Sequence, residues 1–363
     1  MRVVNTHSGT EIATLRLPTR SEHYITVHSM GASRDVLRCV AAKENAFILS
    51  QSVFAGNDLS FDSVGRNVDW PLMWLRSTAR TNGVSSSQAV AISGTVPVPV
   101  LSDGRHIGFI YEDNHARYCR LHGLVPSDLS SARGEQAQSV FETAAAVLAR
   151  SGFRFTDTVR TWIYLDHLLE WYDEFNAVRT SFFEKVGVLD HMIPASTGVG
   201  TGNQSGAAIT MAVLAVQPKS PECTVQTVSS PLQNSALEYR SAFSRAIEIS
   251  SPTHRNLIIS GTASIGLDGS TVHRDDPEKQ IRLTMKTVEA ILESRQMKWN
   301  DLCRGIAYFK DMAYFPIFRR ILTELNIPRF PIEATCADIC RQNLLFEIEV
   351  DAARTRFSQE QYS

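Results

Sequence analysis

Two glutamates near the C-terminus stand in a segment that otherwise suits a protein core. Residues 344–350 read Leu-Leu-Phe-Glu-Ile-Glu-Val, and the two-residue period of a β-strand divides them between two faces. One face carries only apolar side chains and should pack on helices, whereas Glu347 and Glu349 fall on the other. Carboxyl groups in such a place can serve as acids or bases in a cleft. An isolated glutamate on a strand is, however, more often a solvated or salt-bridged surface group.

Arginine and tyrosine recur at one spacing in two earlier segments. Arg304 and Tyr308 share a strand face, and so do Arg160 and Tyr164. In each segment this face lies opposite the one that should pack on helices. The arginines are therefore candidate binders of an anionic ligand, or they bridge acids across the sheet.

The chain contains an internal repeat, which organises these residues. Residues 155–166 match residues 299–310 at constant offset, so that the two arginines and the two tyrosines align. The run Ala-Ile-Ser-Gly-Thr-Val at 91–96 recurs as Ile-Ile-Ser-Gly-Thr-Ala at 258–263. The repeat predicts two related modules in one chain.

Each copy contains two segments with helical periodicity and a closing strand. The apolar stripes are Val140, Ala144, Val147 and Leu148, then Trp171, Phe175, Val178 and Phe182 in the first copy, and Ile281, Met285, Val288 and Leu292, then Phe315, Phe318, Leu322 and Leu325 in the second. The order β-α-β-α-β predicts an α/β module whose helices cover one sheet face. The closing strand of the first copy, 208–216, contains no carboxylate. The chemistry is therefore expected in the second copy.

The repeat and the composition of its flanks predict domain boundaries. Residues 1–88 form an N-terminal extension, 89–217 the first module with an insertion at 106–133, 218–235 a linker, 236–356 the second module and 357–363 a tail. The linker is predicted because 218–231 is rich in proline and serine.

Composition excludes several classes of partner. A net charge of −2 over 363 residues, with both signs scattered, gives no basic stripe for nucleic acid. The first residues have no apolar signal region and no segment is long enough to span a bilayer, so a cytoplasmic protein without a membrane partner is expected. The six cysteines form no CxxC pair, which favours reduced thiols and no structural metal.

The arrangement resembles the RidA/YjgF family. The resemblance rests on a strand ending in Ser260-Gly261, the strand from Arg304 to Tyr308, Phe175-Asn176 in a helix of the first copy, and the final strand with Glu347-Ile-Glu349. It implies the fold class: α/β, with two tandem RidA/YjgF-like (chorismate mutase-like) β-α-β modules behind an N-terminal extension. The keto-acid-binding arginine of many RidA-type proteins, in a Pro-Ala-Arg motif, is Ser196 here and has no clean match near Arg329. Imine deamination is therefore disfavoured.

Three further motifs resemble those of the chorismatases, which split chorismate into pyruvate and either a dihydroxycyclohexadiene or a hydroxybenzoate acid. They are Gly-Arg-Asn-Val-Asp-Trp at 65–70, Pro-Ala-Ser-Thr-Gly-Val-Gly at 194–200 and Ala-Asp-Ile-Cys-Arg at 337–341. The resemblance places the catalytic glutamate of the family on Glu347. Chorismate is the implied substrate.

Chorismate is a dianion with an enol ether, so its site needs cations and an acid that protonates carbon. The candidate substrate-binding residues are Arg160, Arg245, Arg304, Arg341, Tyr164, Tyr308, Ser260, Gly261 and Ala263. Glu347 is the candidate acid, if burial raises its pKa against the opposing arginines. The reaction requires no cofactor.

The resemblance also bears on the ring product. In chorismatases a Cys at the position of Cys340 marks enzymes that form hydroxybenzoate, so 3-hydroxybenzoate is expected, with 4-hydroxybenzoate as co-product or alternative. Ala263 fits the hydrolytic pattern and keeps the dihydroxycyclohexadiene product open; Cys340 is alternatively a core residue. Enamine/imine deamination and small-molecule sensing remain alternative functions. Because simple RidA-type proteins are trimers, tandem modules with the cleft between them predict a monomer or a weak homo-oligomer.

Overall fold

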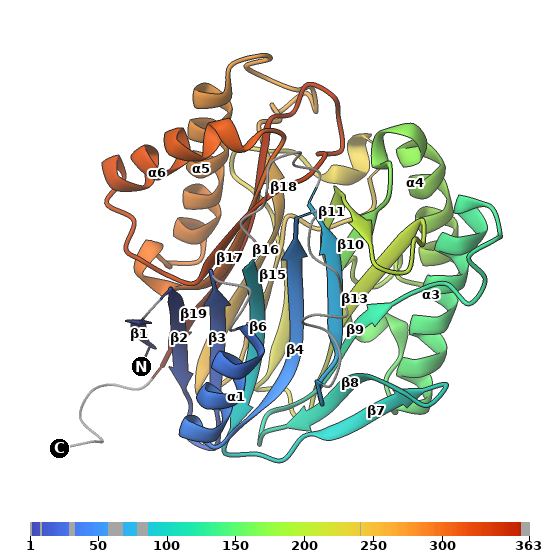
Figure 1. The fold of residues 1–363 in the computed structure, drawn as a ribbon, viewed down its shortest axis with the longest axis vertical. Helices are drawn as coiled ribbons and strands as arrows, with labels where there is room; N and C mark the ends of the chain where they lie inside the picture. The colour runs from blue at the N-terminus through green and yellow to red at the C-terminus, as the bar shows by residue number, and fades with distance from the viewer. Residues whose placement is uncertain are drawn as a thin grey trace.

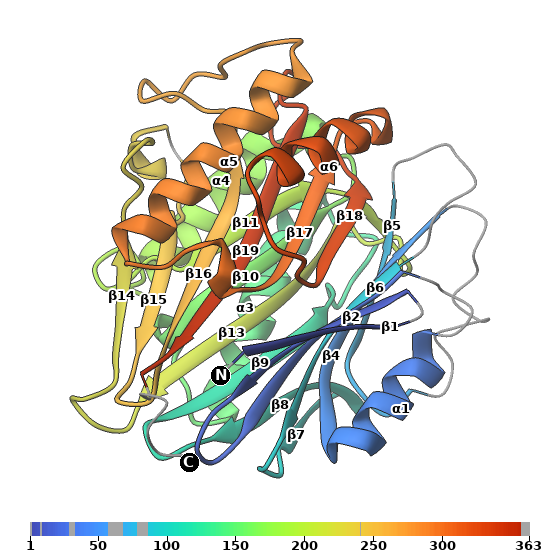
Figure 2. The ribbon, with the colours of Figure 1, turned by 90° about the vertical axis from the view of Figure 1, so that its left-hand side faces the viewer.

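Three mixed β-sheets dominate the computed structural model, which describes residues 2–7, 9–28, 33–56, 68–77, 86–239 and 241–356. Two sheets have six strands, and the third has seven because a short extra strand joins its edge. Figures 1 and 2 show the strands toward the middle of the molecule and the helices on its outside. The fold is therefore three sheets packed around a shared interior.

The C-terminal module contains the two glutamates. Its elements are β14 (Thr224–Val228), β15 (Ala246–Ser250), β16 (His254–Ala263), α5 (Pro277–Ser294), β17 (Leu302–Phe309), α6 (Phe315–Glu324), β18 (Ile332–Cys336) and β19 (Phe346–Thr355). The strand order is β14-β15-β16-β19-β17-β18, with one parallel pair, β17 and β18. Phe346, Ile348 and Val350 of β19 pack with the apolar stripe of α5 in one core, so the predicted division of this strand into two faces is observed.

The middle module repeats this order. Its elements are β7 (Val98–Ser102), β8 (Arg105–Glu112), β9 (Ala116–Leu124), α3 (Arg133–Arg150), β10 (Thr158–Leu165), α4 (Leu168–Lys185), β11 (Ala195–Gly200) and β13 (Ile209–Pro218). The sheet order β7-β8-β9-β13-β10-β11 matches the C-terminal module strand for strand, including the parallel pair at its end. The two helices carry the predicted apolar stripes into one core.

The N-terminal region is a third copy of the same topology, which the sequence did not predict. Its elements are β1 (Arg2–His7), β2 (Thr10–Arg16), β3 (Ser21–Val27), α1 (Ser33–Glu44), β4 (Ala46–Ala55), β5 (Leu72–Arg76) and β6 (Ser86–Ser93). The order β1-β2-β3-β6-β4-β5 again ends in a parallel pair. The short strand β12 (Gly202–Asn203) extends this sheet by pairing with β5.

The third copy moves several predicted boundaries. Residues 91–93 belong to β6 in the N-terminal sheet, and the strand of the middle module that corresponds to β16 is β9. The predicted insertion at 106–133 contains β8 and β9, and the predicted linker contains β14. An apolar run followed by Gly marks the end of a strand, but strand pairing decides to which sheet that strand belongs.

The registers make one set of positions equivalent in the three modules. Glu347 lies opposite Tyr308, Thr210 opposite Tyr164, and Ser86 opposite Phe54. A carboxylate therefore occupies only one of the three equivalent positions.

The inner faces of all three sheets meet in one large core. Its members include Leu15 and Tyr24, Trp162 and Leu214, and Ile258 and Tyr308, two from each module.

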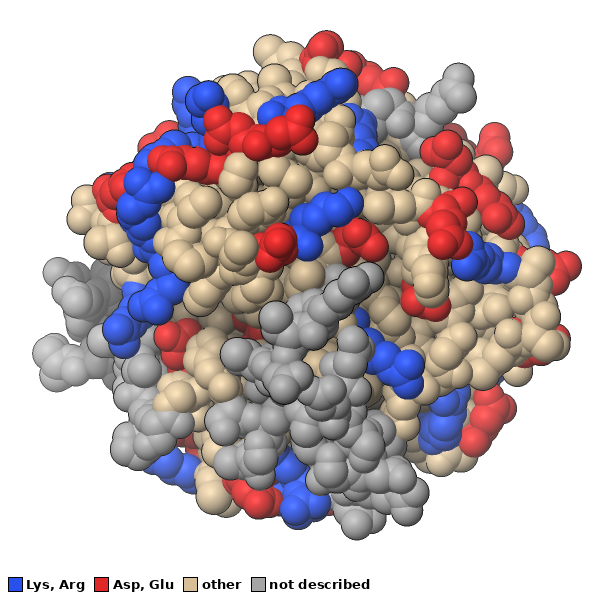
Figure 3. All heavy atoms as spheres, turned by 45° about the horizontal axis from the view of Figure 1, so that its top comes forward, with Lys and Arg blue, Asp and Glu red and all other residues tan. Residues whose placement is uncertain are grey.

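On the face in Figure 3, acidic and basic side chains lie interspersed over the described surface. None of the described helices combines the length and apolar character that crossing a bilayer requires.

Candidate active site

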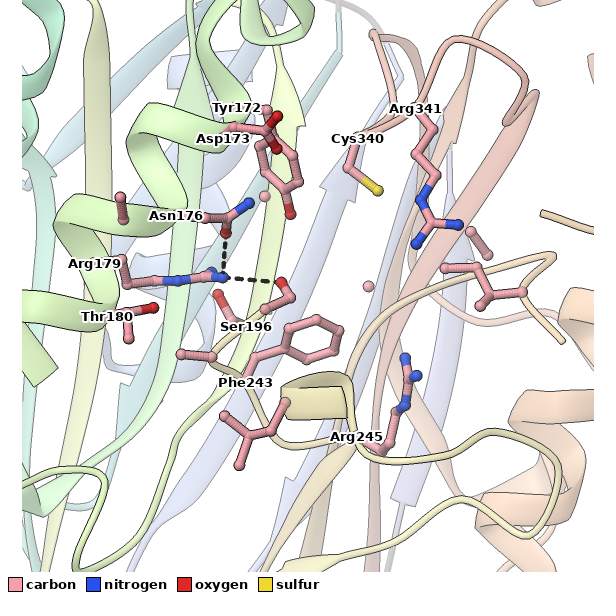
Figure 4. Close-up of a pocket in the computed structure, with 18 of the residues that line it drawn as sticks. Tyr172, Asp173, Asn176, Arg179, Thr180, Ser196, Phe243, Arg245, Cys340 and Arg341 are labelled. Carbon is pink, nitrogen blue, oxygen red and sulfur yellow. Dashed lines mark hydrogen bonds between the residues drawn. The ribbon is translucent and has the colours of Figure 1, made fainter. Parts of the chain in front are cut away.

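The principal cavity in the described part of the molecule lies between the middle and C-terminal modules. It has a volume of about 900 Å³, within the range typical of small-molecule sites. Helix α4 and strand β11 form one side, and β16, β19 and the 337–341 segment form the other (Figure 4). The polar and ionisable groups on its walls include Tyr172, Asn176, Arg179, Ser196, Arg245, Cys340, Arg341 and Glu347.

Direct hydrogen bonds join the two modules at the base of this cavity. The Ser196 N–H donates to Ser260 Oγ at 2.9 Å, and the Gly261 N–H donates to Thr197 Oγ1 at 3.0 Å. The Ser260 hydroxyl in turn donates to the carbonyl oxygen of Ser244. Ser260 is fully buried and Gly261 lines the cavity. Ser260 therefore holds the wall together and does not itself line the cavity.

Glu347 projects from β19 into the cavity wall, opposite Ala263 on β16. Only 5% of the residue is exposed. Burial, reinforced by the charge of Glu349, raises the pKa of Glu347 to about 8, against the opposing effect of Arg160 and Arg245. The carboxyl is thus protonated at neutral pH, as a general acid must be.

Gly261 makes room for this carboxyl group. A Cβ added at Gly261 would overlap Glu347 Oε1 and would lie 3.0 Å from its Cδ. The backbone of β16 is irregular here, with a register shift between Ile259 and Thr262. This steric constraint explains why a glycine follows Ser260 in this chain.

Behind Glu347, a buried ion cluster crosses from one module to another. Glu349 accepts from Arg160 Nη2 at 2.8 Å, from Trp162 Nε1 at 2.8 Å and from Arg304. Burial alone would raise the pKa of Glu349. The ion pairs with Arg160 and Arg304 outweigh this effect and hold that pKa below its usual value. Glu349 is therefore a fixed negative charge two residues from the candidate acid.

This cluster corrects part of the predicted site. Arg160 and Arg304 were candidate substrate binders or bridges between acids across the sheet; both form ion pairs with Glu349, and neither lines the cavity. Tyr164 and Tyr308 also lie in the interior, with their hydroxyl oxygens 3.2 Å apart. The alternation of a strand gives the face correctly, but it cannot show that the sheets of other modules close over most of that face.

Three arginines do surround the cavity. Arg245 donates through Nε and Nη2 to the Asn234 carbonyl, and Arg341 donates through Nη1 to the Gly269 carbonyl at 2.7 Å. Arg179 donates through Nη2 to Asn176 Oδ1 at 2.7 Å and to Ser241 Oγ at 2.9 Å (Figure 4). Protein groups thus fix each guanidinium at the edge of the cavity.

Two cavity residues of α4, Arg179 and Tyr172, were not predicted from the sequence. Arg179 is 2% exposed, although charged helical residues are usually solvated. It lies four residues after Phe175 and three before Phe182, on the buried stripe, and a charge on such a stripe was the available signal. Burial raises the pKa of Tyr172 to about 12, so Tyr172 remains a neutral hydroxyl donor.

Cys340 forms part of an apolar wall next to the acid. It packs against Ala263, Ile265, Ile339 and Leu344. Burial, with the nearby Glu347 charge, raises the pKa of the Cys340 thiol to about 12, so the thiol stays protonated. The side chains that Cys340 contacts here are all apolar.

Two of the three chorismatase-like motifs reach the cavity. Ser196 and Gly198 from 194–200 and Cys340 and Arg341 from 337–341 line it. Of the motif at 65–70, residues 65–67 lie outside the described residues. Trp70 packs in the N-terminal module and donates to Gln51 Oε1 at 2.8 Å.

Within the described ranges, no group of three His, Cys, Asp or Glu side chains could hold a metal ion.

Comparisons with known proteins agree with the α/β fold described above. Residues 233–354, nearly the whole C-terminal module, match the family model described as Endoribonuclease L-PSP. A crystal structure of a chorismatase superposes on 93% of this chain and 99% of its own, with a TM-score of 0.65 and 18% sequence identity. The chain is thus an α/β protein with the fold of that chorismatase.

Sequence similarity points to the same group. The chain is 25% identical over 224 residues to a 3-hydroxybenzoate synthase of Streptomyces hygroscopicus, an alignment that covers 54% of this chain and 64% of that protein. It is also 25% identical over 239 residues to a chorismatase of the same organism, covering 58% of this chain and 67% of the relative. The resemblance to chorismatases and the RidA-like fold class predicted from sequence are confirmed.

Proposed function

We propose that this chain is a chorismatase that converts chorismate to pyruvate and a hydroxybenzoate, with Glu347 as general acid. The observation that carries the proposal is a buried carboxyl with a pKa of about 8 in the wall of a cavity ringed by three arginines. The sequence and fold similarity to proteins named chorismatase and 3-hydroxybenzoate synthase supports the same substrate.

In this mechanism the cavity arginines hold the dianion. The guanidinium groups of Arg179, Arg245 and Arg341 bind the two carboxylates of chorismate, since charge-assisted hydrogen bonds from arginine suit carboxylate geometry. Because other protein groups already fix these side chains, little reorganisation accompanies binding. Tyr172 supplies a neutral hydroxyl near the acid.

Proton transfer then starts the cleavage. Glu347 donates its proton to the methylene carbon of the enol ether, and the adjacent carbon becomes an oxocarbenium centre. Water adding to this carbon gives a hemiketal, which collapses to pyruvate and a dihydroxycyclohexadiene acid. Capture by the neighbouring ring hydroxyl leads instead to pyruvate and a monohydroxybenzoate, with no net consumption of water. Glu347 regains a proton before the next turnover.

The wall near Cys340 favours the internal route. Ala263, Ile265 and Cys340 make one side of the acid's surroundings apolar, and an ordered water needs several polar partners. Excluding water favours capture by the ring hydroxyl. We therefore assign 3-hydroxybenzoate as the main product, with 4-hydroxybenzoate as the alternative.

The fold also supports a monomeric enzyme. Three topologically equivalent modules already surround the interior in one chain, and the cavity draws its walls from two of them. No second copy is needed to complete it.

A direct assay tests the proposal. Purified protein is incubated with chorismate, pyruvate is followed by a coupled assay and the ring product is identified by mass spectrometry. We expect pyruvate and 3-hydroxybenzoate in equal amounts. Absence of pyruvate would refute chorismate cleavage, whereas pyruvate with a dihydroxycyclohexadiene acid would retain the cleavage and reject the product assignment.

A further inference from the structure

A second, smaller polar cavity lies where the three modules meet, separate from the candidate active site. It has a volume of about 30 Å³, enough for about two waters or one monatomic ion, since one water needs about 10–15 Å³. The N-terminal module contributes Ser50, Ser52 and Gln88, the middle module Arg120 and His122, and the C-terminal module Arg304. None of the residues that line it lines the larger cavity.

Arg120 is the unusual member of this group. It is 8% exposed, its Nε has no hydrogen-bond partner, and no hydrogen bond or ion pair of its guanidinium is found among the described residues. Its Cζ lies 5.4 Å from the ring centroid of Trp162, a cation–π contact that involves the face of the guanidinium and not its N–H groups. A buried guanidinium is expected to have an anionic or hydrogen-bonding partner.

No carboxylate in the lining of this cavity compensates the charge of Arg120, which Asp351 attracts only from the adjoining cavity. The lining contains Arg120 and Arg304 but no aspartate or glutamate. Burial, with the charge of Arg120, lowers the pKa of His122 to about 3, so His122 is neutral. Arg304 is already paired with Glu349 and Asp351.

The carboxylates on the far side of Arg120 do not replace such a partner. Glu22 and Asp351 line an adjoining cavity of about 30 Å³ that also contains Arg120. Glu22 is bound by Arg20 and by the Tyr24 hydroxyl at 2.5 Å. Asp351 Oδ2 lies 3.3 Å from Arg304 Nη1. Neither carboxylate makes an ion pair with Arg120 in the described structure.

We propose that the cavity lined by Ser50, Ser52 and Arg120 binds a small monatomic anion of chloride type. The guanidinium of Arg120 supplies charge, and the Ser50 and Ser52 hydroxyls supply further donors. The anion neutralises a buried cation at the point where all three modules touch. Its role is to hold the modules together, and the proposal does not depend on the reaction at Glu347.

Thermal unfolding of the full chain tests this site. Tm is measured from 1 to 100 mM chloride, with gluconate keeping the ionic strength constant. We expect chloride to raise Tm by about 2–6 °C with saturation, because a ligand that binds only the folded state stabilises it. Arg120→Met should abolish the chloride response. Arg117→Met, on the same strand, should keep it, because Arg117 instead donates to Gln217 Oε1 at 2.9 Å.

A Tm that does not depend on chloride, or an equal response in both variants, would overturn the proposal. If Arg120→Met fails to fold, anomalous diffraction from wild-type crystals grown in bromide decides the matter. A bromide peak within hydrogen-bonding distance of the Arg120 guanidinium supports the site. Density for waters alone at that position rejects it.

Discussion

Replacing Glu347 by glutamine should lower turnover strongly and at the same time stabilise the protein, with most of the stability gain at neutral and alkaline pH. The unfolded carboxyl has its ordinary pKa of 4.5, whereas burial and Glu349 raise the pKa to about 8 in the folded state. The folded state therefore holds a proton that the unfolded state releases between these values. Stability contributed by this group is fully present below pH 4.5 and is lost as pH rises toward 8.

The size of the effect follows from the same shift. A difference of about 3.5 pKa units at about 1.4 kcal/mol each gives a full penalty of about 5 kcal/mol. About 4 kcal/mol of it is present at pH 8, where half of the folded molecules still hold the proton, and less than about 1 kcal/mol at pH 5. Glutamine carries no charge to desolvate, so Glu347→Gln should unfold at higher urea concentration than the wild type at pH 8 and at nearly the same concentration at pH 5. Turnover should fall by about 10²-fold to 10⁴-fold, the rate enhancement that general acid catalysis typically contributes.

Glu349→Gln is the matched control, because it makes the same change two residues away on the same face. Ion pairs hold the pKa of Glu349 low, so its removal should destabilise the fold at pH 8. It should also move the loss of activity at high pH to lower pH, since Glu349 helps to raise the pKa of Glu347. If Glu347→Gln kept nearly normal pyruvate release, or gained the same stability at pH 5 and pH 8, Glu347 would not be a buried acid in this mechanism.

Three further substitutions probe the cavity. Cys340→Ala should lower the hydroxybenzoate fraction and raise the dihydroxycyclohexadiene fraction while pyruvate release continues; an unchanged ratio by mass spectrometry would make Cys340 a core residue only. Arg179→Met should raise KM for chorismate by about tenfold or more, with a smaller change in kcat, because a carboxylate loses one charge-assisted bond; steady-state kinetics with KM unchanged would remove Arg179 from substrate binding. Gly261→Ala should lower kcat strongly, because the added Cβ overlaps the Glu347 carboxyl, and kcat near wild type would show that the strand shifts to accommodate it.

The sequence predicted the faces of strands better than their surroundings. The alternation in 344–350 placed Glu347 and Glu349 together correctly, because the period of a strand is fixed by its backbone. It could not show that Glu347 borders a cavity while Glu349 meets Arg160 of another module. That distinction depends on how sheets far apart in sequence pack against each other.

The third module escaped sequence reasoning for a related reason. The N-terminal sheet shares strand order with the others, but at the positions of Arg304 and Tyr308 it carries Ser50 and Phe54. Hydrogen bonds between backbones preserve a topology after the side chains that would reveal it have changed. Of the cavity cations, Arg245 and Arg341 were predicted, whereas Arg179 was hidden in a helix assigned to the core.

Because the three modules belong to one polypeptide, the residues at each junction between modules can be substituted independently of those at the other two. In a ring of identical subunits, one substitution appears three times, so an acid introduced at one junction would be buried at all three, with its desolvation penalty tripled. Here Glu347, Thr210 and Ser86 occupy corresponding places, so an acid at this strand position is buried once and not three times. The junction at Ser86 carries a different acid from the other side, because Ser86 donates to the buried carboxyl of Glu333, whose pKa burial raises to about 7. Each junction of this chain thus has its own polar contact, which a ring of identical subunits could not have.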